Sequence, residues 1–192
     1  LFQLSINMKK IELSYASNIE HSFAQRLIIK TIERVTGKKK LENLYRQYSK
    51  READPKTFWT DILNIMKIKI VNKSKYEIQI PEKGSLIVIA NHPFGIIDGL
   101  ILCSIVSNNR EDFKIMTHET LKFLPQLDKY ILPVNFSGND KETIKSNIRT
   151  ANEAKKHIEN KGVLIIFPSG GVSTAKNLKS DALDDEWKTF PA

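Results

Sequence analysis

The chain has 192 residues, of which 41% are hydrophobic and 27% charged, and it carries a net charge of +8. This composition is typical of a globular domain with a hydrophobic core. No apolar window approaches the roughly 18 residues that a bilayer-spanning helix needs, so none is expected. The first residues also lack the charged and apolar regions of a signal peptide.

Cysteine and histidine are too sparsely arranged to predict a metal centre or a disulfide. Cys103 is the single cysteine and lies in an apolar run, so we expect a buried small residue rather than a nucleophile. The four histidines show no metal-ligand spacing with one another.

The excess positive charge is concentrated in the N-terminal third. From Arg26 to Arg51 nine basic residues stand against two acidic ones. Such a segment attracts polyanions, either nucleic acid or an anionic lipid surface. A solvated face of a soluble helix pair explains the same charges at least as well. Because interleaved aromatic residues and a nucleic-acid-binding motif are missing, we expect no nucleic-acid partner.

Apolar periodicity predicts three helices in the first third, over residues 19–36, 40–50 and 55–66. Gly37 ends the first helix, whose basic polar face would suit either a membrane surface or packing on its own domain. Asp54 and Pro55 are a suitable cap and first-turn residue for the third helix. The period then changes to two over residues 67–70 and 77–80, which favours strands.

Strands and helices alternate from Ser85 onward, after a turn at residues 81–84. The expected strands cover residues 85–90, 113–117, 130–136 and 163–167, and the expected helices cover 99–107, 119–123 and 140–160. Asp98 would cap the helix 99–107, and Pro133 indicates an edge strand or a bulge. The pattern predicts an α/β fold with a largely parallel or mixed central sheet flanked by helices. We divide the chain into an N-terminal helical segment (1–66) and an α/β domain (67–192).

Two glycine-bearing turns, residues 91–99 and 168–173, each follow the carboxyl end of an expected strand. Sites in parallel sheets form outside these ends, so we expect the two turns to face each other across one crevice. His92 and Asp98 can form a base and its orienting carboxylate across the first turn. For an isolated pair, the simpler interpretation is that Asp98 caps a helix and His92 is an ordinary turn residue.

A Ser, Cys or Lys nucleophile with matching local context is missing from both turns. The base would therefore activate an acceptor hydroxyl or amine of the substrate itself, which indicates direct transfer without a covalent enzyme intermediate. Backbone N–H groups of the turn Ser169-Gly170-Gly171 can hold a phosphate or an oxyanion.

The sequence resembles the lysophospholipid/glycerolipid acyltransferase superfamily, in particular a bacterial branch labelled as hemolysins and similar to lyso-ornithine-lipid acyltransferases. The stretch from Asn91 to Gly99 is similar to its first motif, and the stretch from Phe167 to Ser173 is similar to its third. The resemblance covers most of the chain from about residue 40 onward. Further branch-like features are Trp59, the turn 81–84, Arg110, Asp112 and the segment Asp185-Glu186-Trp187.

The resemblance implies acyl transfer in phospholipid biosynthesis, from acyl carrier protein or CoA thioester to a hydroxyl of a lyso-lipid. It also implies a peripheral location at the cytoplasmic face of the inner membrane, contact with an anionic membrane surface and no bound cofactor. His92 would be the general base and Asp98 its orienting partner. The implied substrate-binding residues are Asn91, Phe94, Gly95, Pro168, Ser169, Gly170, Gly171 and Ser173. The alternative is a catalytically inactive, lipid-binding member of the same fold.

The chain departs from the wider superfamily in three respects. Five residues, Pro93 to Ile97, separate His92 from Asp98, one more than usual, and Gly95 is expected to absorb the extra residue. Ser169 and Val172 stand where the third motif has Glu and Arg, which disfavours a phosphate-bearing acceptor. The chain reaches Ala192 before a fourth motif, so part of the acyl-chain tunnel is expected to lie outside it.

The second motif has no clear counterpart, because residues 131–136 occupy its place without an Arg. Lys141, Lys145 and Arg149 on the next helix offer positive charge, although a solvated face is the simpler interpretation.

Overall fold

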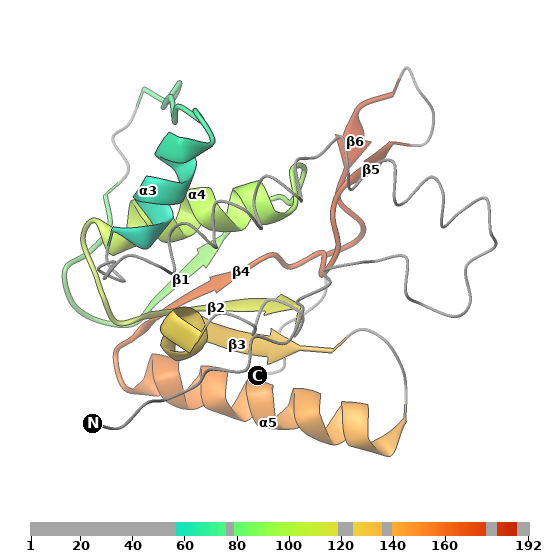
Figure 1. Cartoon of the computed structure of the whole chain (residues 1–192). Coiled ribbons are helices and arrows are strands. Elements are labelled where there is room, and N and C mark those ends of the chain that lie inside the picture. Colours follow the sequence, from blue (N-terminus) through green and yellow to red (C-terminus); the bar gives the residue numbers. More distant parts are fainter. Residues whose placement is uncertain (1–56, 76–78, 119–124, 136–139, 176–179, 188–192) are drawn as a thin grey trace, which may run out of the picture. The chain divides into compact units, whose positions relative to one another are not determined.

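A four-stranded parallel sheet forms the centre of the described part of the chain (Figure 1). The computed structural model describes residues 57–75, 79–118, 125–135, 140–175 and 180–187. The sheet has the order β1-β4-β2-β3. Its strands are β1 (Leu86–Ile89), β2 (Phe113–His118), β3 (Ile131–Val134) and β4 (Val163–Ile166). With helices on both faces, this architecture confirms the predicted α/β fold.

The register of the sheet places the ends of β1 and β4 side by side. Leu86 lies opposite Val163, and Ile89 lies opposite Ile166. Because the two strands are parallel and in line, the turns that follow them leave the sheet at the same edge.

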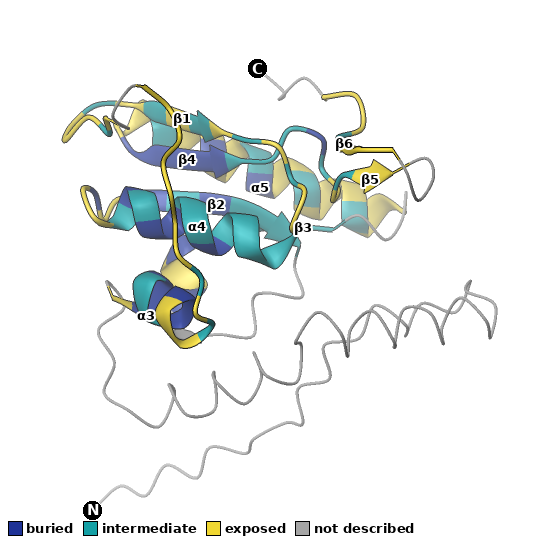
Figure 2. Ribbon diagram, turned by 90° about the horizontal axis from the view of Figure 1, so that it is seen from above, coloured by how far each residue is buried: buried dark blue, intermediate teal, exposed yellow. Residues whose placement is uncertain are grey.

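Helices cover both faces of the sheet, which explains why the inner strand β4 is apolar throughout. The helices α3 (Phe58–Ile65) and α4 (Ile96–Ser107) lie on one side of the sheet, and α5 (Lys141–Glu159) lies on the other (Figure 1). Residues 163–165 of β4 have no exposed surface. Most of β4 carries the dark blue of buried residues in Figure 2. A strand buried on both faces carries apolar side chains continuously rather than alternately.

An aromatic cluster holds α3 against the sheet. The ring of Trp59 lies 5.9 Å from that of Phe113 in β2 and 5.8 Å from that of Tyr130, which ends the 3₁₀ helix η3 (Pro125–Tyr130). Phe113 and Tyr130 stack on each other at 4.6 Å. Burial of such rings is among the largest apolar contributions that single side chains make to stability.

The helix α4 begins three residues earlier than predicted. Gly95 precedes it with φ 61° and ψ −124°, a backbone conformation suited to glycine, and the helix starts directly afterwards at Ile96. Asp98 therefore lies within the first turn and is not the N-cap.

The helix predicted over residues 140–160 is confirmed as α5 (Lys141–Glu159). Asp140 caps it by accepting hydrogen bonds from the N–H groups of Glu142 and Thr143. Ile144 and Ile148 on this helix are 47% and 56% exposed, whereas Ala154 is fully buried and Ile158 packs against the core.

Polar side chains of α5 face the end of β3. The Thr150 hydroxyl donates to the carbonyl oxygen of Pro133, and the Asn147 amide bonds to both backbone groups of Asn135. These contacts satisfy backbone groups at the end of an edge strand, where a neighbouring strand cannot do so.

The strands predicted at 67–70 and 77–80 are absent from the described residues there, 67–75 and 79–80. Ile70 and Val71 are 41% and 61% exposed, so the apolar side chains of this segment do not pack against the core. Two short strands that were not predicted, β5 (Thr174–Ala175) and β6 (Ala182–Leu183), pair antiparallel beyond β4.

Several predictions lie outside the described residues: the helices over 19–36, 40–50 and 119–123, and the cap at Asp54 and Pro55. The division at residue 66 also stays a prediction. No helix among the described residues is both long enough and apolar enough to span a bilayer.

Candidate functional site

The two glycine-bearing turns meet at the carboxyl edge of the sheet, as the sequence predicted. The Ser173 N–H of the second turn donates to the His92 carbonyl oxygen of the first turn at 2.9 Å. A Cβ placed on Gly95 would lie 3.5 Å from a methyl group of Val172, so the turns are in contact there as well.

His92 and Asp98 are joined by a hydrogen bond across the first turn. His92 Nδ1 lies 3.1 Å from Asp98 Oδ2, and the Phe94 N–H donates to the same oxygen at 2.7 Å. The unusual backbone of Gly95 lies between them and lets the five-residue spacing close. The structure thus brings the two predicted side chains together.

The geometry selects one tautomer of His92. A carboxylate only accepts hydrogen bonds, so Nδ1 carries the hydrogen and Nε2 keeps its lone pair. The His92 side chain is 18% exposed and that of Asp98 11%. Nε2 is therefore the atom with which this pair can take up a proton.

Phe167, which the sequence did not single out as a site residue, packs against the imidazole. The two rings are stacked, with centroids 4.0 Å apart and an interplanar angle of 20°. Phe167 follows β4 directly, so the parallel register that aligns the strand ends also sets this contact.

Asp184 is a second residue that sequence reasoning missed. Its carboxylate accepts hydrogen bonds from the backbone N–H of His92 at 3.0 Å, from the Ser173 hydroxyl and from Trp187 Nε1 at 3.0 Å. The hydrogen bond from Ser173 is the main cause that holds the pKa of Asp184 below its usual range. A branch-like segment beginning at the next residue, Asp185, was the only signal near it in the sequence.

The predicted substrate-binding residues of the first turn are open to solvent or shape the backbone. Asn91 is exposed and Phe94 is 69% exposed, while Gly95 supplies the bend before α4. Pro168 is partly buried at the start of the second turn.

In the second turn, the two serine hydroxyls are used within the protein. Ser169 is 3% exposed and donates to the Gly171 carbonyl oxygen, and the Ser173 hydroxyl donates to Asp184. The Gly170 N–H donates to the Phe167 carbonyl oxygen, with φ 73° at Gly170. Any contact of this turn with a substrate therefore falls to its remaining backbone groups and to its shape.

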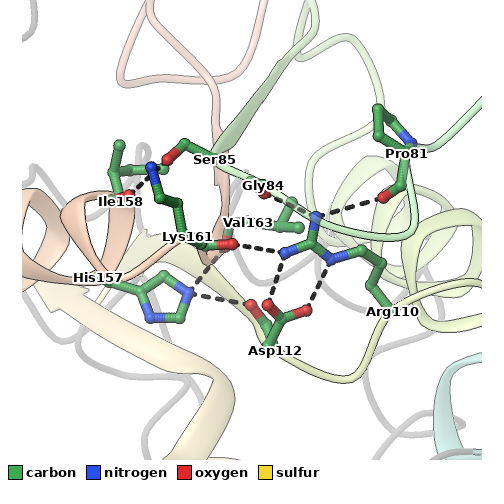
Figure 3. Close-up of polar contacts among 9 residues, drawn as sticks. All are labelled: Pro81, Gly84, Ser85, Arg110, Asp112, His157, Ile158, Lys161 and Val163. Carbon is green, nitrogen blue, oxygen red and sulfur yellow. Dashed lines mark hydrogen bonds and ion pairs between the residues drawn. The ribbon is translucent and has the colours of Figure 1, made fainter.

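A separate polar network closes the opposite, amino-terminal edge of the sheet (Figure 3). Arg110 is 4% exposed and forms a bidentate salt bridge with Asp112. Its guanidinium also donates to the carbonyl oxygens of Pro81, Gly84 and Lys161. His157 Nε2 lies 3.1 Å from the carbonyl oxygens of Asp112 and Val163. This network connects the segments that precede β1, β2 and β4, and so it serves the fold.

A polar cleft of about 750 Å³ lies beside this network, between the start of α3 and the end of α4. Asp61, Glu82 and Glu111 line it, and the guanidinium of Arg110 is already bonded to the protein. The cleft is at the edge of the sheet away from His92.

Cys103 is fully buried in α4, and burial raises the pKa of its thiol. This confirms a packing residue. Across the part of the chain that the structure describes, no group of three or more His, Cys, Asp or Glu side chains is arranged to hold a metal ion.

A comparison with known families finds a match over this region. The model of a family described as Acyltransferase matches residues 71–184. The matched range contains the whole parallel sheet, both turns and Asp184. Comparisons with curated proteins and with solved structures gave no significant match.

Proposed function

The chain belongs to the acyltransferase family, and from this membership we propose that it moves a fatty acyl group from an acyl thioester to a hydroxyl of a lyso-lipid. The observation that carries the proposal is the hydrogen bond of 3.1 Å between His92 Nδ1 and Asp98 Oδ2. It leaves Nε2 as the basic atom of a partly exposed imidazole at the carboxyl edge of a parallel sheet, where ligands of such sheets bind.

In the proposed reaction, Nε2 of His92 takes the proton of the acceptor hydroxyl while that oxygen attacks the thioester carbonyl carbon. Asp98 orients the ring and stabilises the imidazolium that forms. The tetrahedral intermediate then collapses, the carbon–sulfur bond breaks, and the imidazolium returns its proton to the leaving thiolate. General-base catalysis of this kind contributes roughly 10²–10⁴-fold to the rate.

Because the Gly170 N–H already donates to the Phe167 carbonyl oxygen, the backbone N–H groups of Ser169 and Gly171 are the proposed donors to the developing oxyanion. We assign the thioester carrier to acyl carrier protein or CoA, with no bound cofactor.

The third motif favours an acceptor without a phosphate group. Val172 stands where the superfamily has an Arg, and its apolar side chain is 49% exposed. Ser169, in place of the Glu, is buried within its turn. A lyso-ornithine or other N-acyl amino acid lipid fits these residues better than a lysophosphatidate, by analogy with the branch that the sequence resembles.

Apolar side chains beside the pair support a peripheral location at a membrane, for which we propose the cytoplasmic face. Phe94, Leu183 and Trp187 are 69%, 67% and 45% exposed. Side chains of this kind insert into the interface between lipid and water. The basic segment from Arg26 to Arg51 would add attraction to anionic lipids.

The test is transfer of a radiolabelled acyl group from acyl carrier protein or CoA to a panel of lyso-lipids. His92→Ala should lower kcat at least about 10²-fold while circular dichroism and Tm stay close to wild type. The matched control is His157→Ala, which alters a histidine at the opposite, amino-terminal edge of the sheet and should keep kcat within a few-fold in the folded variant. Unchanged transfer by the folded His92→Ala variant would reject the mechanism.

The same assay decides the alternative of a lipid-binding protein without catalysis. Binding of lyso-lipid vesicles by the wild type, with no transfer to any acceptor from either thioester, would favour that alternative.

A further inference from the structure

Both backbone polar groups of His92 are held by residues distant in the sequence. Its N–H donates to Asp184 Oδ1 at 3.0 Å, and its carbonyl oxygen accepts from the Ser173 N–H at 2.9 Å. The Ser173 hydroxyl donates to the same oxygen of Asp184. The three residues therefore form a closed ring of hydrogen bonds around the backbone of His92.

The second oxygen of Asp184 fixes the orientation of the carboxylate. Asp184 Oδ2 accepts from Trp187 Nε1 at 3.0 Å, so both oxygens have donors and the side chain cannot rotate without losing one. Three donors on one partly buried carboxylate stabilise its ionised form, and hydrogen bonds to an ionised acceptor are stronger than those between neutral groups.

The backbone of His92 depends on these hydrogen bonds because it lies beyond the end of the strand ladder. The ladder between β1 and β4 ends with the pair Ile89 and Ile166, three residues before His92. Beyond that point only side-chain and turn contacts limit the backbone rotations that move the imidazole. A displacement of about 1 Å of a catalytic group can lower the rate roughly 10²-fold.

We propose that Asp184 is a positioning residue, which fixes the backbone of His92 and couples the two turns so that the imidazole stays aligned with Asp98. This inference rests on the proposed function for its kinetic consequence, although the geometry it describes can be tested without activity. Asp184 acts through the backbone of His92, so its removal should lower kcat more than it raises KM.

The first arm of the test is Asp184→Ala in the full chain, assayed over a range of acceptor concentrations. The expected result is a kcat lowered roughly 10–100-fold with KM within about threefold of wild type. Asp181→Ala is the matched control, because it removes an exposed carboxylate three residues earlier in the chain, and its kcat should stay within about twofold. Trp187→Phe is measured alongside as the reference for the double variant described next. A kcat for Asp184→Ala equal to wild type would overturn the inference.

The second arm separates position from charge and does not require Asp184→Ala to fold. Asp184→Asn keeps an acceptor oxygen for His92 and Ser173 but turns an amide N–H₂ toward Trp187 Nε1, so two donors conflict. In the double variant Asp184→Asn/Trp187→Phe the conflict is gone. We expect the double variant to recover most of the kcat that Asp184→Asn loses. Equal losses in both variants would show that charge rather than position is what matters, and would refute the proposal.

The third arm uses NMR of protein labelled with ¹⁵N-histidine, in which the Nδ1–H signal of His92 is assigned by its loss in His92→Ala. The signal should be present in the wild type and in the double variant and lost or broadened in Asp184→Ala. An unchanged signal in a folded Asp184→Ala would contradict the inference. If the wild type transfers no acyl group but its signal depends on Asp184, the proposed function fails while the positioning role stands.

Discussion

His92 and Phe167 lie face to face, with ring centroids 4.0 Å apart, just beyond the carboxyl ends of β1 and β4, where the two turns begin. Phe167 therefore limits the tilt of the His92 ring, and the hydrogen bond to Asp98 limits its rotation. The imidazole is fixed by one contact from its own turn and by one from the neighbouring strand.

Replacing Phe167 with Leu should reduce kcat about 2–10-fold, since a stacked aromatic pair contributes about 0.5–1.5 kcal/mol beyond its buried area. Acyl-transfer kinetics measure the effect. The control is Phe58→Leu in α3, whose ring packs edge-on against Trp59 with centroids 5.1 Å apart, and it should lower Tm without changing kcat. Equal kcat values in the wild type and in folded Phe167→Leu would show that the stacking does not serve the site.

Gly95→Ala should destabilise the fold by about 1–3 kcal/mol, because φ 61° with ψ −124° is strained for any residue with a Cβ. The space around Gly95 is sufficient, since the nearest atom would be an ordinary 3.5 Å away. Gly171→Ala is the control in the second turn, with nothing within 4 Å of the added Cβ, and it should be neutral. Urea unfolding measures both, and equal midpoints would reject the role assigned to Gly95.

Stability should fall in acid through Asp112. The hydrogen bond from Arg110 lowers the pKa of this carboxyl in the folded state, so its contribution is present above its unfolded pKa of about 3.9 and is lost as pH decreases through the folded value. Asp112→Asn should therefore flatten the loss of Tm between about pH 5 and pH 2. The effect is modest because the Asp112 side chain is 53% exposed. A Tm profile identical to that of the wild type would contradict this.

Cys103 should react with a thiol reagent only when the chain unfolds. Its side chain has no exposed surface, and burial raises the pKa of the thiol, so little thiolate is present. Labelling with 5,5′-dithiobis(2-nitrobenzoate) should be slow in buffer and should follow the unfolding curve in urea. Rapid labelling of the native protein would mean that α4 opens locally.

The parallel sheet and the meeting of the two turns were predictable because both depend on local patterns. Apolar runs ending in glycine turns identify strands and their carboxyl ends, and a parallel order brings those ends together. The pairing of His92 with Asp98 followed from the same logic, with Gly95 correctly expected to absorb the extra residue.

The contacts that support the pair could not be predicted, because they depend on long-range register. Asp184 bonds to the backbone of His92, and backbone bonds leave no signature in side-chain patterns. The inward side of α5 could not be predicted for a related reason. Backbone groups at the end of β3 bond to Asn147 and Thr150, which apolar spacing cannot identify.

The order β1-β4-β2-β3 also determines when this domain can be completed on the ribosome. The edge strand β1 has β4 as its only hydrogen-bonded neighbour in the described sheet. Leu86 therefore cannot pair in the sheet until Val163 has been synthesised. The strands β2 and β3 can pair with each other long before that. The edge carrying His92 is thus the last to close, and contacts so distant along the chain slow folding. Until then β1 has no strand partner, and an unpaired apolar strand is prone to aggregate.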